Sequence, residues 1–273
     1  MPAFICTACG TQYPPSDQPP PQCPICEEER QYVPPGGQSW TTLASLSARA
    51  MNAWREYEPG ITGIGTQPSF GIGQRALLLR TPRGNILWDC IALIDDATVS
   101  AIRALGGLKA IAISHPHFYT SMNEWAQAFD APIYLHAADQ AWIMNRGEHV
   151  TLWDGERKEL GGGVTLIRCG GHFPGGTVLH WMKEGRGVVC SGDVLSVTTD
   201  RKFVSFMRSY PNFLPLSARE VEGVAAAMAP YAYETIYGHY FDRVIPTDAK
   251  AVMARSVERY LKAVAGTARP YGT

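Results

Sequence analysis

The sequence has no excess of charge of either sign. Among its 273 residues, 24 lysines and arginines are balanced by 25 aspartates and glutamates, so the formal net charge is −1 with histidine neutral. Such a balance provides no general attraction for nucleic acid or for acidic membrane surfaces. We therefore expect neither a nucleic-acid partner nor a membrane partner.

Long apolar runs are also missing. No stretch approaches the roughly 20 apolar residues that a membrane helix needs, and residues 1–6 show neither the basic nor the apolar region of an export signal. Four of the seven cysteines form two Cys-x-x-Cys pairs, which indicates metal binding in a reducing compartment rather than disulfide bonds. A cytoplasmic protein is expected, and the composition leaves its oligomeric state open.

The composition changes along the chain and divides it into parts. Residues 1–34 contain four cysteines and a proline-rich stretch but few residues able to form a core, so this segment needs a metal or a disulfide to fold. Residues 35–59 are interpreted as a linker and lead-in because of Pro34-Pro35-Gly36-Gly37. Residues 60–273 alternate strand-like and helix-like segments, which predicts one α/β domain.

The N-terminal segment has the spacing of a four-cysteine metal site. Cys6 and Cys9 form one pair, Cys23 and Cys26 the other, and thirteen residues separate the pairs. Tetrahedral thiolate sites are built this way, and the first pair is similar to those of zinc ribbons and rubredoxins. The spacer is shorter than rubredoxins usually have, which favours structural zinc over redox iron. We expect this module to stabilise its own fold or to bind a protein partner.

Five further polar residues follow short apolar runs that predict buried strands. They are His115, His117, His172, Asp193 and His239. Strand ends in a layered α/β domain lie along one rim, so these side chains can converge although they are distant in sequence. Imidazoles and a carboxylate are ligands for zinc, and iron is a possible occupant of either metal site.

Local patterns predict several individual elements. A turn at Thr81-Pro82-Arg83-Gly84 between two apolar runs predicts a β-hairpin. Ser121 with Glu124, and Ser217 with Glu220, have the spacing of capping boxes at helix starts.

Over roughly residues 40 to 265 these motifs resemble the metallo-β-lactamase-fold superfamily. The resemblance implies an αββα sandwich of four layers, with metal bound at one edge of the sheets. It also implies a first metal site at His115, His117 and His172, with Asp193 bridging to a second site completed by His239. The family's first loop usually reads His-x-His-x-Asp-His, whereas here Tyr119 and Thr120 occupy the last two positions. This degraded second site predicts a single tightly bound metal.

The predicted function is a mononuclear zinc hydrolase acting on a small ester, thioester or lactone. Asp193 would accept a proton from the attacking water, and His239 would protonate the leaving group or orient an oxyanion. Candidate substrate contacts are Tyr119, Arg208 and Tyr210. Two alternatives stay open: an iron-containing oxidoreductase or electron-transfer protein, and a non-catalytic binding member of the superfamily.

Overall fold

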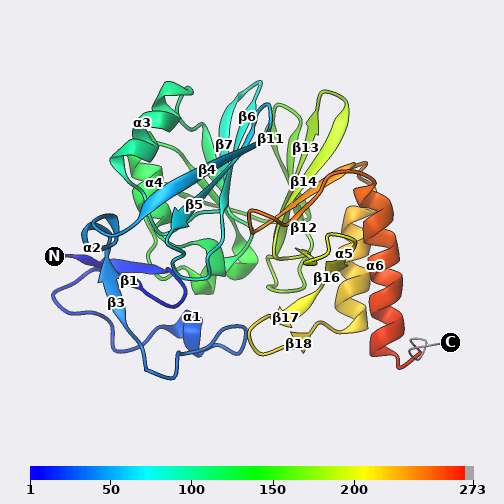
Figure 1. Ribbon diagram of the computed structural model, residues 1–273, viewed down its shortest axis with the longest axis horizontal. Coiled ribbons are helices and arrows are strands. Elements are labelled where there is room, and N and C mark those ends of the chain that lie inside the picture. Colours follow the sequence, from blue (N-terminus) through cyan, green and yellow to red (C-terminus); the bar gives the residue numbers. More distant parts are fainter. Residues whose placement is uncertain (268–273) are drawn as a thin grey trace. The chain divides into compact units, whose positions relative to one another are not determined.

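Most apolar runs of the sequence form β-strands, and these strands are grouped into two large sheets (Figure 1). The computed structural model describes residues 1–267, and the chain divides into one unit at residues 1–154 and a second that begins at residue 155. None of the helices within the described part is long and apolar enough to cross a lipid bilayer.

A small sheet in the order β2-β1-β3 carries the N-terminal cysteines. It consists of β1 (Ala3–Cys6), β2 (Gln12–Pro15) and β3 (Trp40–Thr42), and β1 pairs antiparallel with both neighbours. The short helices α1 (Pro24–Glu27) and α2 (Leu43–Ser47) follow β2 and β3. Residues 35–59 therefore contain β3, α2 and all of β4 (Met51–Glu58), a strand of the large sheet.

The large sheet of the first unit has seven strands in the order β10-β9-β8-β7-β6-β5-β4. Its strands are β4 (Met51–Glu58), β5 (Ile61–Gln67), β6 (Ala76–Thr81), β7 (Gly84–Trp88), β8 (Ala110–Ala112), β9 (Ile133–His136) and β10 (Val150–Trp153). Strands β4 to β7 form an antiparallel meander, whereas β7 to β10 run parallel. The β6–β7 hairpin confirms the predicted turn, with Gly84 at φ 112°.

Helices cover one face of this sheet. They are α3 (Asp96–Ala104), α4 (Met122–Phe129) and the 3₁₀ segments η1 (Pro116–Phe118) and η2 (Ala137–Trp142). Ile102 of α3 and Trp125 of α4 are fully buried in one cluster with Leu87 of β7. Through these side chains both helices bury an apolar face against the sheet.

The second unit has a six-stranded sheet in the order β11-β12-β13-β14-β19-β20. Its strands are β11 (Arg157–Gly161), β12 (Val164–Arg168), β13 (Thr177–Lys183), β14 (Arg186–Gly192), β19 (Thr235–Gly238) and β20 (Val244–Ile245). Two small ribbons pair β15 (Ser196–Val197) with β16 (Val204–Ser205), and β17 (Met207–Ser209) with β18 (Leu214–Pro215). The helices α5 (Ala218–Met228) and α6 (Ala249–Val264) pack on this sheet through Val224 and Val252.

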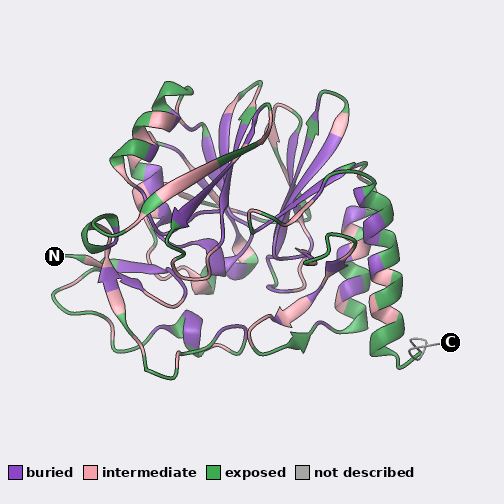
Figure 2. Ribbon diagram, in the orientation of Figure 1, coloured by how far each residue is buried: buried purple, intermediate pink, exposed green. Residues whose placement is uncertain are grey.

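Burial follows this arrangement. In Figure 2 the central strands of both sheets are buried, while α5 and α6 each have one buried and one exposed side. The mixed α/β architecture with several sheets confirms the predicted fold class, and the clustered cysteines are compatible with a small N-terminal module.

One predicted helix cap is confirmed and the other is wrong. Ser217 and Glu220 form a complete capping box at the start of α5. At α4, Ser121 makes no side-chain cap; its hydroxyl instead donates to the carbonyl of Ala92 at 2.7 Å. Glu124 accepts a hydrogen bond from Gln12 at 3.0 Å. Tertiary partners therefore replaced the local cap, because they offered both side chains buried hydrogen bonds.

Candidate metal centres

Two histidines of the first unit follow the parallel strand β8. His115 comes three residues after β8, and His117 lies in η1, where Pro116 at the first position starts the 3₁₀ turn. Both rings are buried, with 1% and 3% of each residue exposed. One nitrogen of each ring lies within 4.8 Å of the other, and the ring centroids are 5.1 Å apart. This spacing permits both imidazoles to bind one ion.

A buried aspartate, Asp89, orients His115 through a serine. Asp89 follows β7, the neighbour of β8, and its carboxylate accepts the Ser114 N–H at 2.8 Å and a bond from the Ser114 hydroxyl. The Ser114 hydroxyl lies 2.8 Å from His115 Nδ1. Because that hydroxyl donates to Asp89, it accepts from Nδ1–H, which places the imidazole lone pair on Nε2.

Burial also raises the pKa of Asp89 to about 7, although the Ser114 hydrogen bonds and Arg75 act in the opposite direction. Asp89 is not among the residues predicted from the sequence. Its signal was present, since Asp89 follows the apolar run Ile86-Leu87-Trp88 as the predicted ligands follow theirs.

In the second unit, His172 lies in a glycine turn beside Asp193. Gly170 and Gly171 have φ of 67° and 78°, which a residue with a Cβ adopts only at a cost, so the turn requires glycine. His172 Nδ1 donates to the Met207 carbonyl at 3.0 Å, and its Nε2 lies 3.8 Å from a carboxylate oxygen of Asp193. The lone pair of this imidazole is therefore also on Nε2, next to a carboxylate.

His239 follows β19, which pairs in parallel with β14, the strand that leads to Asp193. Its Nδ1 donates to the Gly192 carbonyl at 3.1 Å, and the residue is buried. Among the described residues, His239 is not in either group that could hold a metal. His239 and Asp193 thus follow two neighbouring parallel strands.

The three candidate substrate contacts differ in their surroundings. The Tyr210 hydroxyl donates to the Asp193 carbonyl at 2.9 Å, and the ring lies 5.7 Å from that of His172. Burial raises the pKa of Tyr210 and that of Tyr119, so both phenols stay protonated. Arg208 is half-buried in β17.

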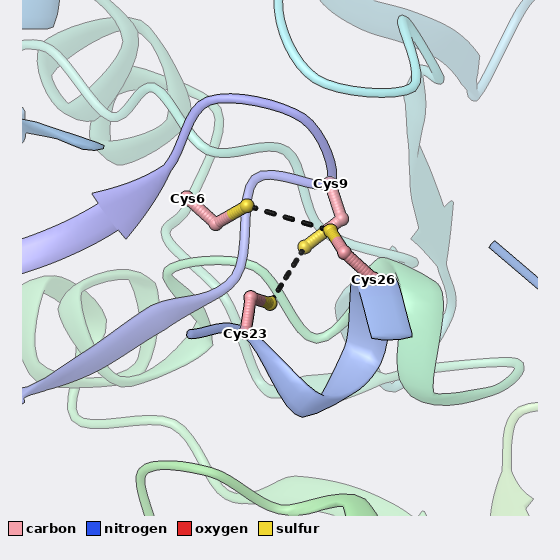
Figure 3. A group of neighbouring side chains, drawn as sticks. All are labelled: Cys6, Cys9, Cys23 and Cys26. Carbon is pink, nitrogen blue, oxygen red and sulfur yellow. Dashed lines mark hydrogen bonds between the residues drawn. The ribbon is translucent and has the colours of Figure 1, made fainter. Parts of the chain in front are cut away.

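Four buried cysteines meet in the first unit (Figure 3). Cys6 and Cys26 sulfurs are 3.6 Å apart, Cys9 and Cys23 sulfurs are 3.7 Å apart, and no disulfide joins any of them. Sulfurs placed tetrahedrally at about 2.3 Å from a zinc ion would be separated by about 3.8 Å. The observed spacing thus fits a tetrahedral ion.

Donors surround these sulfurs. The Tyr13 hydroxyl donates to Cys23 Sγ at 3.2 Å, and the Gln38 amide donates to Cys6 Sγ at 3.0 Å. Hydrogen bonds shared with Cys23 and Cys26 hold the pKa of Cys6 well below its usual value. Donors of this kind stabilise thiolates, which are the form that binds metal.

Comparison with known proteins places this fold in a family. The sequence matches the metallo-beta-lactamase superfamily over residues 71–239. The uncharacterised protein YmaE of Bacillus subtilis (strain 168) is 44% identical over 268 residues, which cover 97% of each chain. The chain therefore belongs to the metallo-beta-lactamase superfamily.

Solved structures agree with this fold. The structure of DIM-1 metallo-beta-lactamase exposed to ceftazidime aligns with a TM-score of 0.59 at 13% identity, covering 78% of this chain and 97% of that chain. A metallo-beta-lactamase from Cronobacter sakazakii with a mutated HARLDQ motif aligns with a TM-score of 0.51 at 19% identity, covering 78% and 95%. At such low sequence identity these similarities show the fold alone.

Members of this superfamily are generally metal-dependent hydrolases. The described residues include two groups whose donor atoms could hold a metal ion. One group is Cys6, Cys9, Cys23 and Cys26, and the other is His115, His117, His172 and Asp193.

Proposed function

We propose that this protein is a hydrolase that uses one zinc ion bound by His115, His117 and His172. Asp193 is the fourth ligand or the group that orients the bound water. One observation carries the proposal: His115 in the first unit and His172 in the second both engage Nδ1 in a hydrogen bond. Each therefore presents the Nε2 lone pair, which is how zinc-binding histidines are held.

The donor set suits the chemistry of hydrolysis. A zinc ion bound by three imidazoles lowers the pKa of a coordinated water to about 7 and polarises a carbonyl group. The Asp193 carboxylate, 3.8 Å from His172 Nε2, can accept the proton that the attacking water loses. His239, whose Nδ1 is held by Gly192, can deliver a proton from Nε2 to the leaving oxygen or sulfur.

A single ion at the histidines follows from the rest of the loop. The family pattern continues with aspartate and histidine, and here Tyr119 and Thr120 stand at those positions. The pKa of Tyr119 is raised by burial, so the phenol is a poor ligand. Asp193 and His239 alone provide two ligands, which is too few to hold a second ion tightly.

We assign a structural zinc ion to the four cysteines. Four thiolates complete a tetrahedral shell, so such an ion has no open position for a substrate. A module of this size needs the ion to fold. The module can in addition bind a protein partner. For the histidine site we propose small esters, thioesters or lactones as substrates. We propose that the enzyme acts in the cytoplasm.

Metal analysis of purified protein tests the proposal. The unaltered protein should contain two zinc ions per chain and hydrolyse members of a panel of simple esters, thioesters and lactones. His117→Ala should contain one zinc ion and lose hydrolysis, because the remaining ligands are placed for a set that includes His117 and hold the ion less tightly without it. His149→Ala, a half-buried histidine outside the ligand set, should match the unaltered protein.

Other results would redirect the assignment. Two zinc ions in His117→Ala would remove that histidine from the ligand set. Iron at the cysteines would favour an electron-transfer protein, and zinc at the cysteines alone would favour a binding protein that has lost catalysis.

A further inference from the structure

The knuckle between Cys6 and Cys9 is a rigid turn once its sulfurs hold an ion. The Gly10 N–H donates to the Cys6 carbonyl at 2.9 Å, and the Cys6 N–H donates to the Thr11 carbonyl at 2.9 Å. Gly10 has φ of 83°, a conformation that glycine adopts without cost. The backbone from Cys6 to Gln12 is thus set by the metal and these bonds together.

This knuckle packs directly against Thr120. A Cβ at Gly10 would lie 3.4 Å from Thr120 Cγ2 and 3.5 Å from Ala92 Cβ. Gln12, two residues after Gly10, donates its backbone N–H to the Thr120 carbonyl at 3.1 Å. The cavity between the knuckle and Thr120 has a volume of about 10 Å³, which is about the space of one water molecule.

Thr120 has an unfavourable backbone conformation that needs such support. Its φ is 40°, in the left-handed region that β-branched residues rarely enter, at a cost of about 1–3 kcal/mol. It stands three residues after His117 and directs the chain from η1 into α4. A change at Thr120 would therefore move the turn that carries His117.

The Gln12 side chain makes a second connection to the same segment. Its amide donates to Glu124 in the first turn of α4 at 3.0 Å, and Gln12 is 3% exposed. Ser121 is tied to Ala92, which also contacts the knuckle. The segment after His117 is thus hydrogen-bonded to the cysteine module at Thr120 and again at Glu124.

We infer that the four-cysteine module positions the histidine metal site, with Gln12 as the positioning residue that holds Thr120 and Glu124. Thr120 occupies the position where the family loop pattern continues with a second-site histidine. Here the thiolate module provides the support that a second ion would provide there. The inference rests on the proposed role of His117 as a metal ligand.

Cobalt binding tests the inference, because Co²⁺ reports each site separately. Thiolate-to-cobalt charge-transfer bands in the near ultraviolet report the cysteine site, and cobalt bound beyond one ion per chain, counted by equilibrium dialysis, reports the histidine site. Gln12→Ala should lower the affinity of the histidine site about 10-fold, the usual effect of losing a group that orients a ligand. The bands of the cysteine site and the thermal unfolding midpoint should change little.

Three further variants show whether the effect depends on the hydrogen bond between Gln12 and Glu124 and on the cysteine module. Gln18→Ala, an exposed glutamine of the same module, should bind cobalt as the unaltered protein does. Adding Glu124→Ala to Gln12→Ala should cause little further loss of affinity, because both substitutions remove the same side-chain hydrogen bond. Cys26→Ser should weaken cobalt binding at both sites, since it loosens the knuckle from a position remote from Thr120.

The outcomes separate the two proposals. Unchanged histidine-site affinity in Gln12→Ala, with strong binding in the unaltered protein, would overturn the positioning role alone. Equal losses in Gln12→Ala and Gln18→Ala would also overturn it. Binding of only one cobalt ion per chain in the unaltered protein, with the thiolate bands fully developed, would overturn the histidine metal site and this inference with it.

Discussion

Replacing Asp89 with asparagine should stabilise the protein, and the gain in unfolding free energy should be larger at pH 8 than at pH 5. Burial raises the pKa of Asp89 from 3.8 to about 7, so the folded protein keeps a proton that the unfolded chain loses. The carboxyl therefore contributes no penalty below pH 4, and stability falls as pH rises toward 7. Above pH 7 both states are ionised and the penalty is constant.

The size of the effect follows from the shift. Each pKa unit corresponds to about 1.4 kcal/mol, and about two units of the shift lie above pH 5. The unaltered protein should therefore lose about 3 kcal/mol relative to Asp89→Asn between pH 5 and pH 8. Asparagine keeps an oxygen that can accept the Ser114 N–H, so this backbone hydrogen bond is retained.

Urea unfolding of both proteins at the two pH values measures this difference directly. Metal content is determined for each sample, so that metal loss at low pH is counted equally for both. Asp17→Asn changes an exposed carboxylate and serves as the control, with the same difference from the unaltered protein at both pH values. A free-energy difference for Asp89→Asn that does not change with pH would refute the argument from burial.

Two further substitutions test the second unit. Tyr210→Phe removes the donor to the Asp193 carbonyl, so we expect a loss of about 1 kcal/mol in unfolding free energy. We also expect slower hydrolysis, because the Asp193 carboxylate is displaced. Unchanged kcat/KM would mean that Tyr210 does not position Asp193. Ser217→Ala removes the capping box with Glu220 and should cost about 1 kcal/mol in urea unfolding. Ser100→Ala, at an exposed position of α3, should leave the unfolding free energy unchanged. A loss equal to that of Ser217→Ala would exclude capping as the cause.

The sequence predicted much of the local structure. The hairpin at residues 76–88 and the box at Ser217 are confirmed, because a turn or a cap depends on residues within a few positions of one another. Polar residues that follow apolar runs also predicted the candidate metal ligands, and their binding of one ion stays a proposal.

The same rules failed where a side chain found a distant partner. Ser121 and Glu124 have the spacing of a capping box, yet Ser121 donates to Ala92, and Glu124 accepts from Gln12, 112 residues away. Asp89 was overlooked because its role depends on Ser114, 25 residues later, across the pairing of β7 with β8. Neither contact leaves a periodic pattern in the sequence.

The amino-acid sequence alone determined the chemistry available to this protein: four thiols at metal-binding spacing, and imidazoles and carboxylates at the ends of apolar strands. Tertiary structure decided which groups orient them, through Asp89 beside Ser114 and the cysteine knuckle against Thr120. The physical reason is the range of the interactions. Periodicity and capping act over a few residues, whereas hydrogen bonds between buried groups depend on which strands and loops become neighbours when the core forms.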